Sequence, residues 1–258
     1  MRYKLAAIDL DGTLLRRDGS LSERTRAALQ ATQLEIVLVS ARGPRGVREV
    51  VDAAGLAGTA IASNGGMVLD LREQSVRRIR AIETEVAVRL VETLRERLPG
   101  ILFGVERESF AHEQGFSAWN WTPPPDTRIG DALELLDEPP TKLILRHHGH
   151  ELEVIAAAAR EVLGDEACVY ISGEWVVEVS AAGVNKAAAL AEVCEELAIE
   201  PRDVVAFGDH LNDVPMLAWA GHGVAVANAH PDVIDAADEV TASNEEDGVA
   251  IVLERLSA

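Results

Sequence analysis

The chain has 258 residues, of which 48% are hydrophobic, and it carries a formal net charge of −19 at pH 7. That length and apolar content suffice for one large domain or two small ones with a full core. The negative charge repels polyanions, which argues against nucleic acid or an anionic membrane surface as a partner. A small anionic substrate would therefore need local positive charge, from a metal ion or from a few placed Lys and Arg side chains.

The sequence also argues against export and against a cysteine framework. No run of roughly 18 or more apolar residues offers a membrane span, and the first residues lead into a charged strand end rather than a signal-peptide cleavage site. We therefore expect a cytoplasmic protein. Cys168 and Cys194 lie far apart and lack partners of the CxxC kind, so we expect buried free thiols rather than a disulfide or a zinc site.

Short apolar runs alternate with helical stretches from residue 4 to about residue 66. The runs KLAAID, EIVLVS and TAIAS are rich in Ile, Val, Leu and Ala and have the length of strands, and helical segments separate them. This alternation predicts βαβ units around a parallel sheet that is buried on both faces.

The pattern changes in the middle of the chain and then returns. A long amphipathic helix is expected at about 83–98, and residues 101–180 favour antiparallel strands with helices near 130–138 and 150–163. From Val184 onward, strands and helices alternate again. We therefore predict an α/β protein: a Rossmann-like, doubly wound parallel-sheet core and an inserted α+β domain. The predicted boundaries are 1–82 and 182–258 for the core, and 83–181 for the insert.

Two acids, Asp9 and Asp11, follow the first apolar run, and Gly12 and Thr13 come directly after them. Alternation along a strand would place both acids on one side, with Leu10 on the other. At the carboxyl end of a parallel strand they would lie in the crevice where open α/β sheets bind ligands. Two close carboxylates either raise one pKa or recruit a cation, for which Mg²⁺ is the natural candidate. Considered alone, the pair is equally compatible with a solvated turn.

Polar residues also follow other predicted strands. Ser40 ends EIVLVS just before a helix, where a hydroxyl either receives a phosphate or caps the helix. Asp209 and Asp213 form a second acid cluster after the strand VVAF. Lys186 opens the helix predicted at 184–198, where the positive end of the helix dipole is unfavourable for a cation. A nearby anion would remove that conflict.

The segments IDLDGT and GDHLNDVPML, together with Ser40 and Lys186, resemble the motifs of the haloacid dehalogenase superfamily of phosphatases, in order and in predicted element. The large insert resembles the Cof-type branch with an α/β cap (type IIB). Further matching segments are SNGG at 63–66, NA at 228–229 and SNEEDGVA at 243–250. The resemblance covers the core from end to end and the cap in outline.

The resemblance implies a division of labour among the acids. Asp9 would attack phosphorus and form an aspartyl phosphate, and Asp11 would protonate the leaving oxygen and later accept a proton from water. Mg²⁺ would be held by the Asp9 carboxylate, the backbone carbonyl of Asp11 and Asp209. Asp213 would support the metal directly or through water.

The same resemblance implies a phosphate pocket. Ser40, Lys186 and Asn212 would bind the transferring phosphoryl group and supply the positive charge that an acidic chain requires. Ala41 stands where many relatives have Gly, which restricts the backbone beside Ser40.

Six further residues are candidates for contacts with the rest of the substrate: Arg42, Arg45, Asn64, Trp119, Trp121 and His210. The two arginines would suit a second anionic group, although a surface position explains them equally well. The tryptophans lie in an irregular, Pro-rich segment and either form a lid or cover the small core of the cap. For the histidine, a surface position is the simpler interpretation.

These observations predict a Mg²⁺-dependent phosphatase of a small phosphorylated metabolite, with sugar phosphates as the first choice of substrate and a monomer or homodimer as the assembly. A phosphomutase or phosphotransferase would use the same aspartyl phosphate but deliver the phosphoryl group elsewhere. A receiver-type signalling module has similar residues but lacks an inserted domain. A non-catalytic metabolite-binding protein is the remaining alternative, and phosphate release distinguishes it.

Overall fold

The computed structural model describes residues 3–116, 127–172 and 175–257. The chain divides into two compact units. The larger contains the described residues up to Arg42, Gly46–Arg78 and those from Asn185 onward; the smaller contains Ile79–Val184 together with the short stretch Gly43–Arg45. Among the described residues, no helix has both the length and the apolar character needed to cross a membrane.

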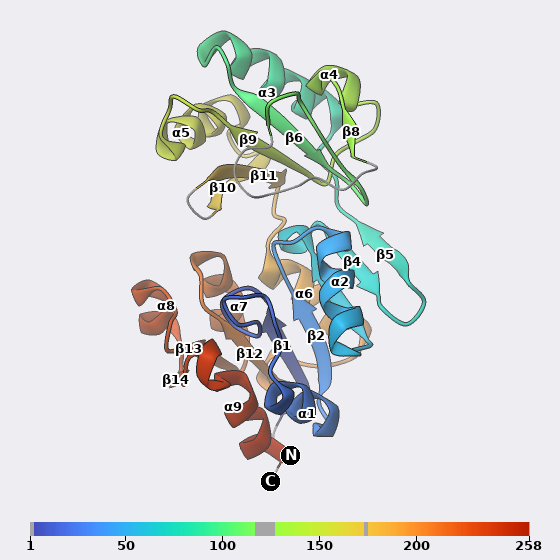
Figure 1. The fold of residues 1–258 in the computed structure, drawn as a ribbon, viewed down its shortest axis with the longest axis vertical. Helices are drawn as coiled ribbons and strands as arrows, with labels where there is room; N and C mark the ends of the chain where they lie inside the picture. The colour runs from blue at the N-terminus through green and yellow to red at the C-terminus, as the bar shows by residue number, and fades with distance from the viewer. Residues whose placement is uncertain (1–2, 117–126, 173–174, 258) are drawn as a thin grey trace. The chain divides into compact units, whose positions relative to one another are not determined.

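The larger unit is built on an eight-stranded sheet with the order β14-β13-β12-β1-β2-β3-β4-β5 (Figure 1). Its strands are β1 (Leu5–Asp9), β2 (Glu35–Val39), β3 (Thr59–Ala62), β4 (Met67–Asp70), β5 (Ser75–Ile79), β12 (Val204–Gly208), β13 (His222–Val226) and β14 (Glu239–Thr241). The six strands from β14 to β3 pair in parallel, whereas β4 returns antiparallel to β3. All five residues of β1 are buried, as expected for a central strand covered on both faces. The α/β class predicted from the sequence is confirmed.

Helices lie on both faces of this sheet (Figure 1). They are α1 (Glu23–Ala31), α2 (Pro44–Ala54), α6 (Lys186–Glu196), α7 (Val214–Trp219), α8 (Pro231–Ala236) and α9 (Gly248–Ser257), with 3-10 turns η1 (Ser63–Gly65), η2 (Pro201–Asp203), η3 (Leu211–Asp213) and η4 (Asn244–Glu246). α1 contacts α9, while α7 contacts both α6 and α8. Because β2 and β12 flank β1 on opposite sides, the strand order reverses at β1, and the carboxyl ends beside it are where an open α/β sheet is expected to bind a ligand.

The smaller unit is an α+β fold, with a six-stranded sheet in the order β10-β11-β9-β6-β7-β8. Its elements are α3 (Thr84–Arg97), β6 (Leu102–Glu106), β7 (Phe110–His112), β8 (Arg128–Ile129), α4 (Ala132–Leu135), β9 (Lys142–Arg146), α5 (Leu152–Leu163), β10 (Ala167–Ser172) and β11 (Val176–Ala181). The helix expected at 130–138 is shorter than predicted. Pro139 and Pro140 follow closely, and the residue before a proline disfavours helical backbone.

The two faces of the smaller sheet differ in polarity. Side chains on one face, such as Phe103, Leu143 and Val179, join α3 and α5 in a hydrophobic core. On the other face, Lys142 Nζ lies 3.0 Å from Glu178 Oε1 and 3.5 Å from Glu106 Oε1, and all three side chains are buried. Burial by itself would lower the pKa of Lys142, but the two glutamates outweigh it and the pKa is raised. The lysine is therefore charged at neutral pH.

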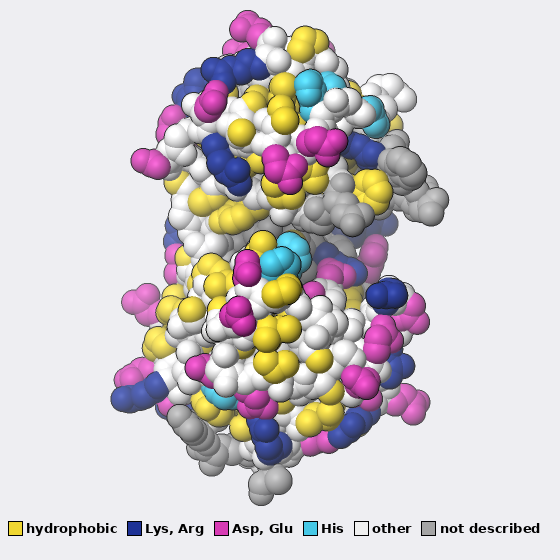
Figure 2. Space-filling view, turned by 90° about the vertical axis from the view of Figure 1, so that its left-hand side faces the viewer, with side chains coloured by type: hydrophobic (Ala, Val, Ile, Leu, Met, Phe, Trp, Pro, Cys, Tyr) yellow, Lys and Arg dark blue, Asp and Glu magenta, His cyan; other side chains and the backbone are white. Residues whose placement is uncertain are grey.

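Most other ion pairs lie at the surface, where each contributes little to stability. Figure 2 shows hydrophobic side chains in small groups among acidic and basic ones on both units. One such surface pair joins Lys4, whose side chain is 62% exposed, to Asp203.

The buried lysine allows a test of the energetics of the smaller unit. Replacing Lys142 by Met should lower the free energy of unfolding by about 3–5 kcal/mol, because it removes the buried ammonium group that lies against two buried glutamates. Urea denaturation followed by circular dichroism measures the change. Lys4→Met removes an exposed pair and should cost no more than about 1 kcal/mol. If both variants lost the same small amount of unfolding free energy, the charges of Lys142, Glu106 and Glu178 would not stabilise the smaller unit.

The thiols allow a second test. Cys194 is buried and Cys168 is partly buried, and burial raises the pKa of the Cys194 thiol to about 11. Because the thiolate is the reactive form, native protein should label slowly at Cys194 near pH 8 and faster as the pH approaches 11. The contribution of the protonated thiol to stability is complete below the ordinary thiol pKa and is lost as pH rises through about 11. Labelling at native pH 8 as fast as in urea, read by mass spectrometry, would contradict this burial.

Candidate active site

The candidate site gathers residues that follow the carboxyl ends of neighbouring strands. Asp9 ends β1, Ser40 follows β2, and Asp209 follows β12. Because β2 and β12 both pair in parallel with β1, these three ends meet at the same edge of the sheet, at the point where the strand order reverses. The fold therefore brings together residues that lie up to two hundred positions apart in the sequence.

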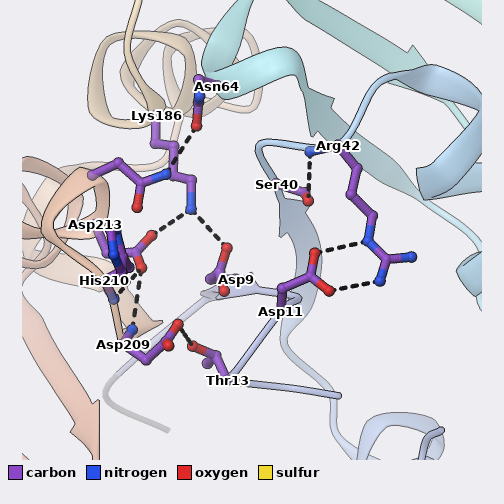
Figure 3. A network of polar contacts seen from close by, with 11 residues as sticks. Asp9, Asp11, Thr13, Ser40, Arg42, Asn64, Lys186, Asp209, His210 and Asp213 are labelled. Atoms are coloured by element: carbon purple, nitrogen blue, oxygen red, sulfur yellow. Dashed lines mark hydrogen bonds and ion pairs between the residues drawn. The ribbon is translucent and has the colours of Figure 1, made fainter. Parts of the chain in front are cut away.

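Lys186 is the buried cation of the site (Figure 3). It is the first residue of α6, whose preceding Asn185 caps the helix by accepting a hydrogen bond from Ala188 N–H. Its Nζ donates to Asp9 Oδ1 and to Asp213 Oδ1, at 2.6 Å each. These are the anions that a lysine at a helix N-terminus requires. Burial lowers the pKa of Lys186, but Asp213 and Asp9 more than offset this, so the pKa is raised and the side chain stays charged.

Asp213 is a completely buried acid that uses both of its oxygens. Oδ1 accepts from Lys186, while Oδ2 accepts from the backbone N–H groups of Asp209 and His210 at 3.1 and 3.0 Å. Gly208 makes this close approach possible, because a Cβ there would lie 2.5 Å from Asp213 Cβ. Asp213 thus fixes the turn after β12 and the lysine at the same time.

Asp209 is oriented by the turn after β1. Thr13 Oγ1 donates to Asp209 Oδ1 at 2.9 Å. Gly12 has φ +83°, and a Cβ at this position would lie 2.2 Å from Asp209 Oδ2. Only glycine suits both the backbone conformation and the space. Gly12 and Thr13 therefore serve the second acid cluster directly.

The acids suit a divalent cation. Carboxylate oxygens of Asp9, Asp209 and Asp213 lie within 4.8 Å of one another. Burial raises the pKa of Asp9 well above its ordinary value, and repulsion from Asp213 and Asp209 adds to this against the opposing effect of Lys186. Burial and Asp213 likewise raise the pKa of Asp209. Three carboxylates near one ammonium group leave an excess of negative charge. Carboxylate oxygens are also the ligands that Mg²⁺ prefers.

Asp11 differs from Asp9 in position and partner. Strand β1 ends at Asp9, so Asp11 lies in the turn beyond it, and the strand alternation used in the sequence analysis does not set its direction. Its side chain is 55% exposed and forms a two-pronged pair with Arg42, in which Nε and Nη2 donate to the two carboxylate oxygens at 2.7 and 2.6 Å. Figure 3 shows Asp9 directed toward Lys186 and Asp11 toward Arg42.

A strained turn supports the loop that carries Ser40. Three successive residues after β3 have left-handed backbone: Ser63 (φ 53°), Asn64 (φ 56°) and Gly65 (φ 106°). This conformation directs Ser63 N–H to the Arg42 carbonyl at 2.8 Å and Asn64 N–H to the Ser40 carbonyl at 3.0 Å. Such strain is found where the surrounding structure over-determines the backbone, often at functional sites.

Asn212 lies beside this turn rather than against the lysine. Its Nδ2 donates to Asn64 Oδ1 at 3.0 Å, while its Oδ1 is buried and has no partner among the described residues. The Asn212 amide oxygen is thus available to accept a hydrogen bond, and its Nδ2 has a second hydrogen to donate. Among the hydrogen bonds of the described residues, none joins the Asn212 side chain to Asp9 or to Lys186.

Two asparagines from the segments at 228–229 and 243–250 support the turn after β1. Asn228 Nδ2 donates to the Gly12 carbonyl at 2.7 Å, and Asn244 Nδ2 donates to the Leu15 carbonyl at 2.8 Å. Asn228 Oδ1 in turn accepts from Asn244 N–H at 2.9 Å. The turn after β1 is therefore tied to the loops after β13 and β14, a long-range arrangement for which the sequence contains no local signal.

The other substrate candidates are less informative. The side chains of Arg45, in the first turn of α2, and of His210, at the start of η3, are exposed. The exposure of His210 agrees with the surface position favoured from the sequence. Trp119 and Trp121 lie outside the described residues.

The chain is similar over its whole length to known proteins. The model of haloacid dehalogenase-like hydrolases matches residues 6–253. Two Bacillus subtilis proteins named 5-amino-6-(5-phospho-D-ribitylamino)uracil phosphatase are each 30% identical: YcsE, matched over 96% of this chain and 93% of its own, and YitU, over 95% and 94%. The crystal structure of a haloacid dehalogenase-like hydrolase from Bacteroides thetaiotaomicron has a TM-score of 0.82 and 26% identity, over 98% and 99% of the two chains. The chain therefore belongs to the haloacid dehalogenase-like hydrolase family, and it is an enzyme of the phosphatase kind.

Proposed function

We propose that this phosphatase hydrolyses a monoester of a small phosphorylated metabolite with the help of Mg²⁺ and through an aspartyl phosphate on Asp9. The observation that carries the proposal is the buried Lys186, which bridges Asp9 and Asp213 at the reversal point of the sheet. Asp9, Asp209 and the backbone carbonyl of Asp11 would hold the metal, and Asp213 would support it directly or through water. We assign residues 1–82 and 182–258 to catalysis, and 83–181 to a cap that selects the substrate.

The side chains suit two successive displacements. A carboxylate oxygen of Asp9 attacks phosphorus, the bond from phosphorus to the ester oxygen breaks, and Asp11 gives that oxygen a proton. Water then attacks the phosphorus of the aspartyl phosphate, and Asp11 takes a proton from it. Asp9 is thereby released as a carboxylate, together with inorganic phosphate. When bound, Mg²⁺ supplies charge that offsets the repulsion between the acids and a phosphate dianion.

The phosphoryl group would be held by donors that remain available. An ammonium group has three donors, and Lys186 uses two of them on Asp9 and Asp213. The third would meet a phosphoryl oxygen. Ser40 Oγ accepts from Arg42 N–H at 3.0 Å and can donate its own hydrogen to the phosphate. Asn212 Nδ2 uses one of its two hydrogens on Asn64 Oδ1, so its second N–H is the remaining candidate donor.

For the substrate, sugar phosphates and related polyol phosphates are our first choice. The names of YcsE and YitU specify a substrate whose phosphate is carried by a ribityl chain. That supports a primary alkyl phosphate on a hydroxylated chain as the class to test first. Release of inorganic phosphate to water distinguishes a phosphatase from a phosphomutase, which would return the group to an acceptor.

The nucleophile gives the decisive test. Asp9→Asn should reduce Mg²⁺-dependent release of phosphate from p-nitrophenyl phosphate by about 10³-fold or more, because the amide cannot form the phosphoenzyme. Asp52→Asn, the same change at an exposed position of α2, serves as the control and should leave the rate unchanged. Release of phosphate by Asp9→Asn at the wild-type rate would overturn the proposed nucleophile. If the wild-type enzyme released none from a broad panel of phosphate esters, the proposed function itself would be wrong.

Metal binding can be tested through Thr13, which touches Asp209 rather than a metal. Thr13→Val removes the hydrogen bond that orients Asp209 and should raise the Mg²⁺ concentration for half-maximal activity by roughly 10–100-fold. Thr13→Ser retains a hydroxyl and should restore most of the affinity. Calorimetric titration of the enzyme with Mg²⁺ alone provides a readout independent of turnover. Equal affinities for the wild type and the Val variant would exclude this role of Thr13.

A further inference from the structure

The contact between Arg42 and Asp11 points to a role that neither residue's motif position assigns. Arg42 was a candidate for holding a second anionic group of the substrate, but its guanidinium directs two donors at the Asp11 carboxylate, at 2.7 and 2.6 Å. The fork of Arg matches a carboxylate in this two-pronged way, which fixes both the distance and the plane of the partner. The hydrogen bonds to Asp11 also raise the pKa of Arg42, so the arginine remains charged.

The backbone of Arg42 is itself held in place. Its N–H donates to Ser40 Oγ at 3.0 Å, and its carbonyl accepts from Ser63 N–H at 2.8 Å. The stem of the side chain passes across Gly46 in α2, where an added Cβ would lie 3.3 Å from both Cβ and Cδ of Arg42. Arg42 is therefore a well-anchored group that extends from the phosphate-binding loop toward the turn after β1.

Asp11, by contrast, has little else to orient it. It lies beyond the end of β1, and its side chain is 55% exposed. An ion pair with this exposure contributes only about 0–1 kcal/mol to stability. Its main consequence is orientation, because it restricts an otherwise mobile carboxylate to one direction. A carboxylate oxygen has more than one lone-pair site, so an oxygen bound to Arg42 can still meet the oxygen of a leaving group.

We infer that Arg42 is a positioning residue that holds the Asp11 carboxylate for proton transfer to the leaving oxygen. The inference rests on the proposed function. Arg42 keeps its own protons throughout: one proton passes from Asp11 to the ester oxygen as that bond to phosphorus breaks, and another passes from water to Asp11 when the phosphoenzyme is hydrolysed. Misplacement of such a group by about 1 Å costs on the order of 100-fold in rate.

The leaving group provides the test. An alkyl phosphate needs a proton on its leaving oxygen, whereas the nitrophenolate of p-nitrophenyl phosphate leaves readily without one. The ratio kcat/KM reports the steps up to formation of the phosphoenzyme. Arg42→Gln should therefore lower kcat/KM for glycerol 3-phosphate by roughly 10–100-fold and that for p-nitrophenyl phosphate by less than about 3-fold. Arg42→Lys, which loses the two-pronged geometry, should restore only part of the loss.

Two controls separate this role from others. In an Asp11→Asn background, Arg42→Gln should have almost no further effect on kcat/KM for the alkyl ester, since the arginine acts through the acid. Arg48→Gln removes an arginine of α2 whose side chain reaches the Gln74 carbonyl, and it should leave kcat/KM for both substrates unchanged. Thermal denaturation of each variant checks that the fold is retained. Gly46→Ala, which crowds the stem of Arg42, should produce a smaller loss with the same preference for the alkyl ester.

The outcomes separate the inference from the proposed function. If Arg42→Gln lowers kcat/KM for both esters equally, and does so again in the Asp11→Asn background, then Arg42 binds the substrate directly and the inference is wrong. If Arg42→Gln left kcat/KM for the alkyl ester unchanged, the inference would also be wrong. Neither result affects the phosphatase activity of the wild-type enzyme. If the wild-type enzyme had no phosphatase activity, the inference and the proposed function would both be wrong.

Discussion

The candidate site depends on one buried electrostatic contact, in which Lys186 lies between Asp9 and Asp213. Its ammonium group joins the end of β1, the start of α6 and the turn η3 through two bonds of 2.6 Å. Charges buried to this degree are costly unless paired, and removal of one partner typically costs about 3–5 kcal/mol. The three elements therefore have one mutual placement in which all three charges are satisfied. The positions of Asp9, Lys186 and Asp213 in the candidate site follow from that placement.

The loops around this contact are held by backbone conformations that are costly in isolation. Ser63 and Asn64 adopt left-handed φ values without being glycine, which costs of order 1 kcal/mol or more each. In return, their N–H groups fix the carbonyls of Arg42 and Ser40. The Ser40 hydroxyl, the Arg42 guanidinium and the Asn212 amide are thus positioned by one turn. Rigid support of this kind is what a site needs to hold several groups around a single phosphorus atom.

Much of this arrangement was predictable because local pattern and chemistry agreed. The apolar runs that became β1, β2, β3 and β12 are short and buried, and parallel pairing brings their carboxyl ends to one edge. The sequence alone was therefore enough to place the acids and the lysine in one site. The antiparallel strand β4 was not assigned, because a run of four residues after a turn, three of them buried, is too short to show a periodicity that separates a strand from a loop.

The pairing of Arg42 with Asp11 illustrates what pattern reasoning cannot supply. The two residues are 31 positions apart, and their contact depends on the turn after β1, on the loop after β2 and on the space above Gly46. Each of these is a tertiary feature. From the sequence, Asp11 was expected to follow strand alternation, and Arg42 was expected either to hold a substrate anion or to lie at the surface. Both expectations rested on local sequence features, whereas long-range contacts in the fold set the positions of these two side chains.

The charge balance of the site argues for the metal more strongly than any single residue does. The site carries four carboxylates, those of Asp9, Asp11, Asp209 and Asp213, and two cationic side chains, Lys186 and Arg42, form ion pairs with them. Each of these cations is already paired with an acid. A phosphate dianion that approached this group would meet an excess of negative charge, on a protein that is itself strongly acidic. Repulsion between close charges in a partly desolvated site amounts to several kcal/mol, which is more than the third donor of Lys186 and the Ser40 hydroxyl can offset. A divalent cation among the three clustered acids removes that excess, so the same acids that would repel the substrate become the means of binding it.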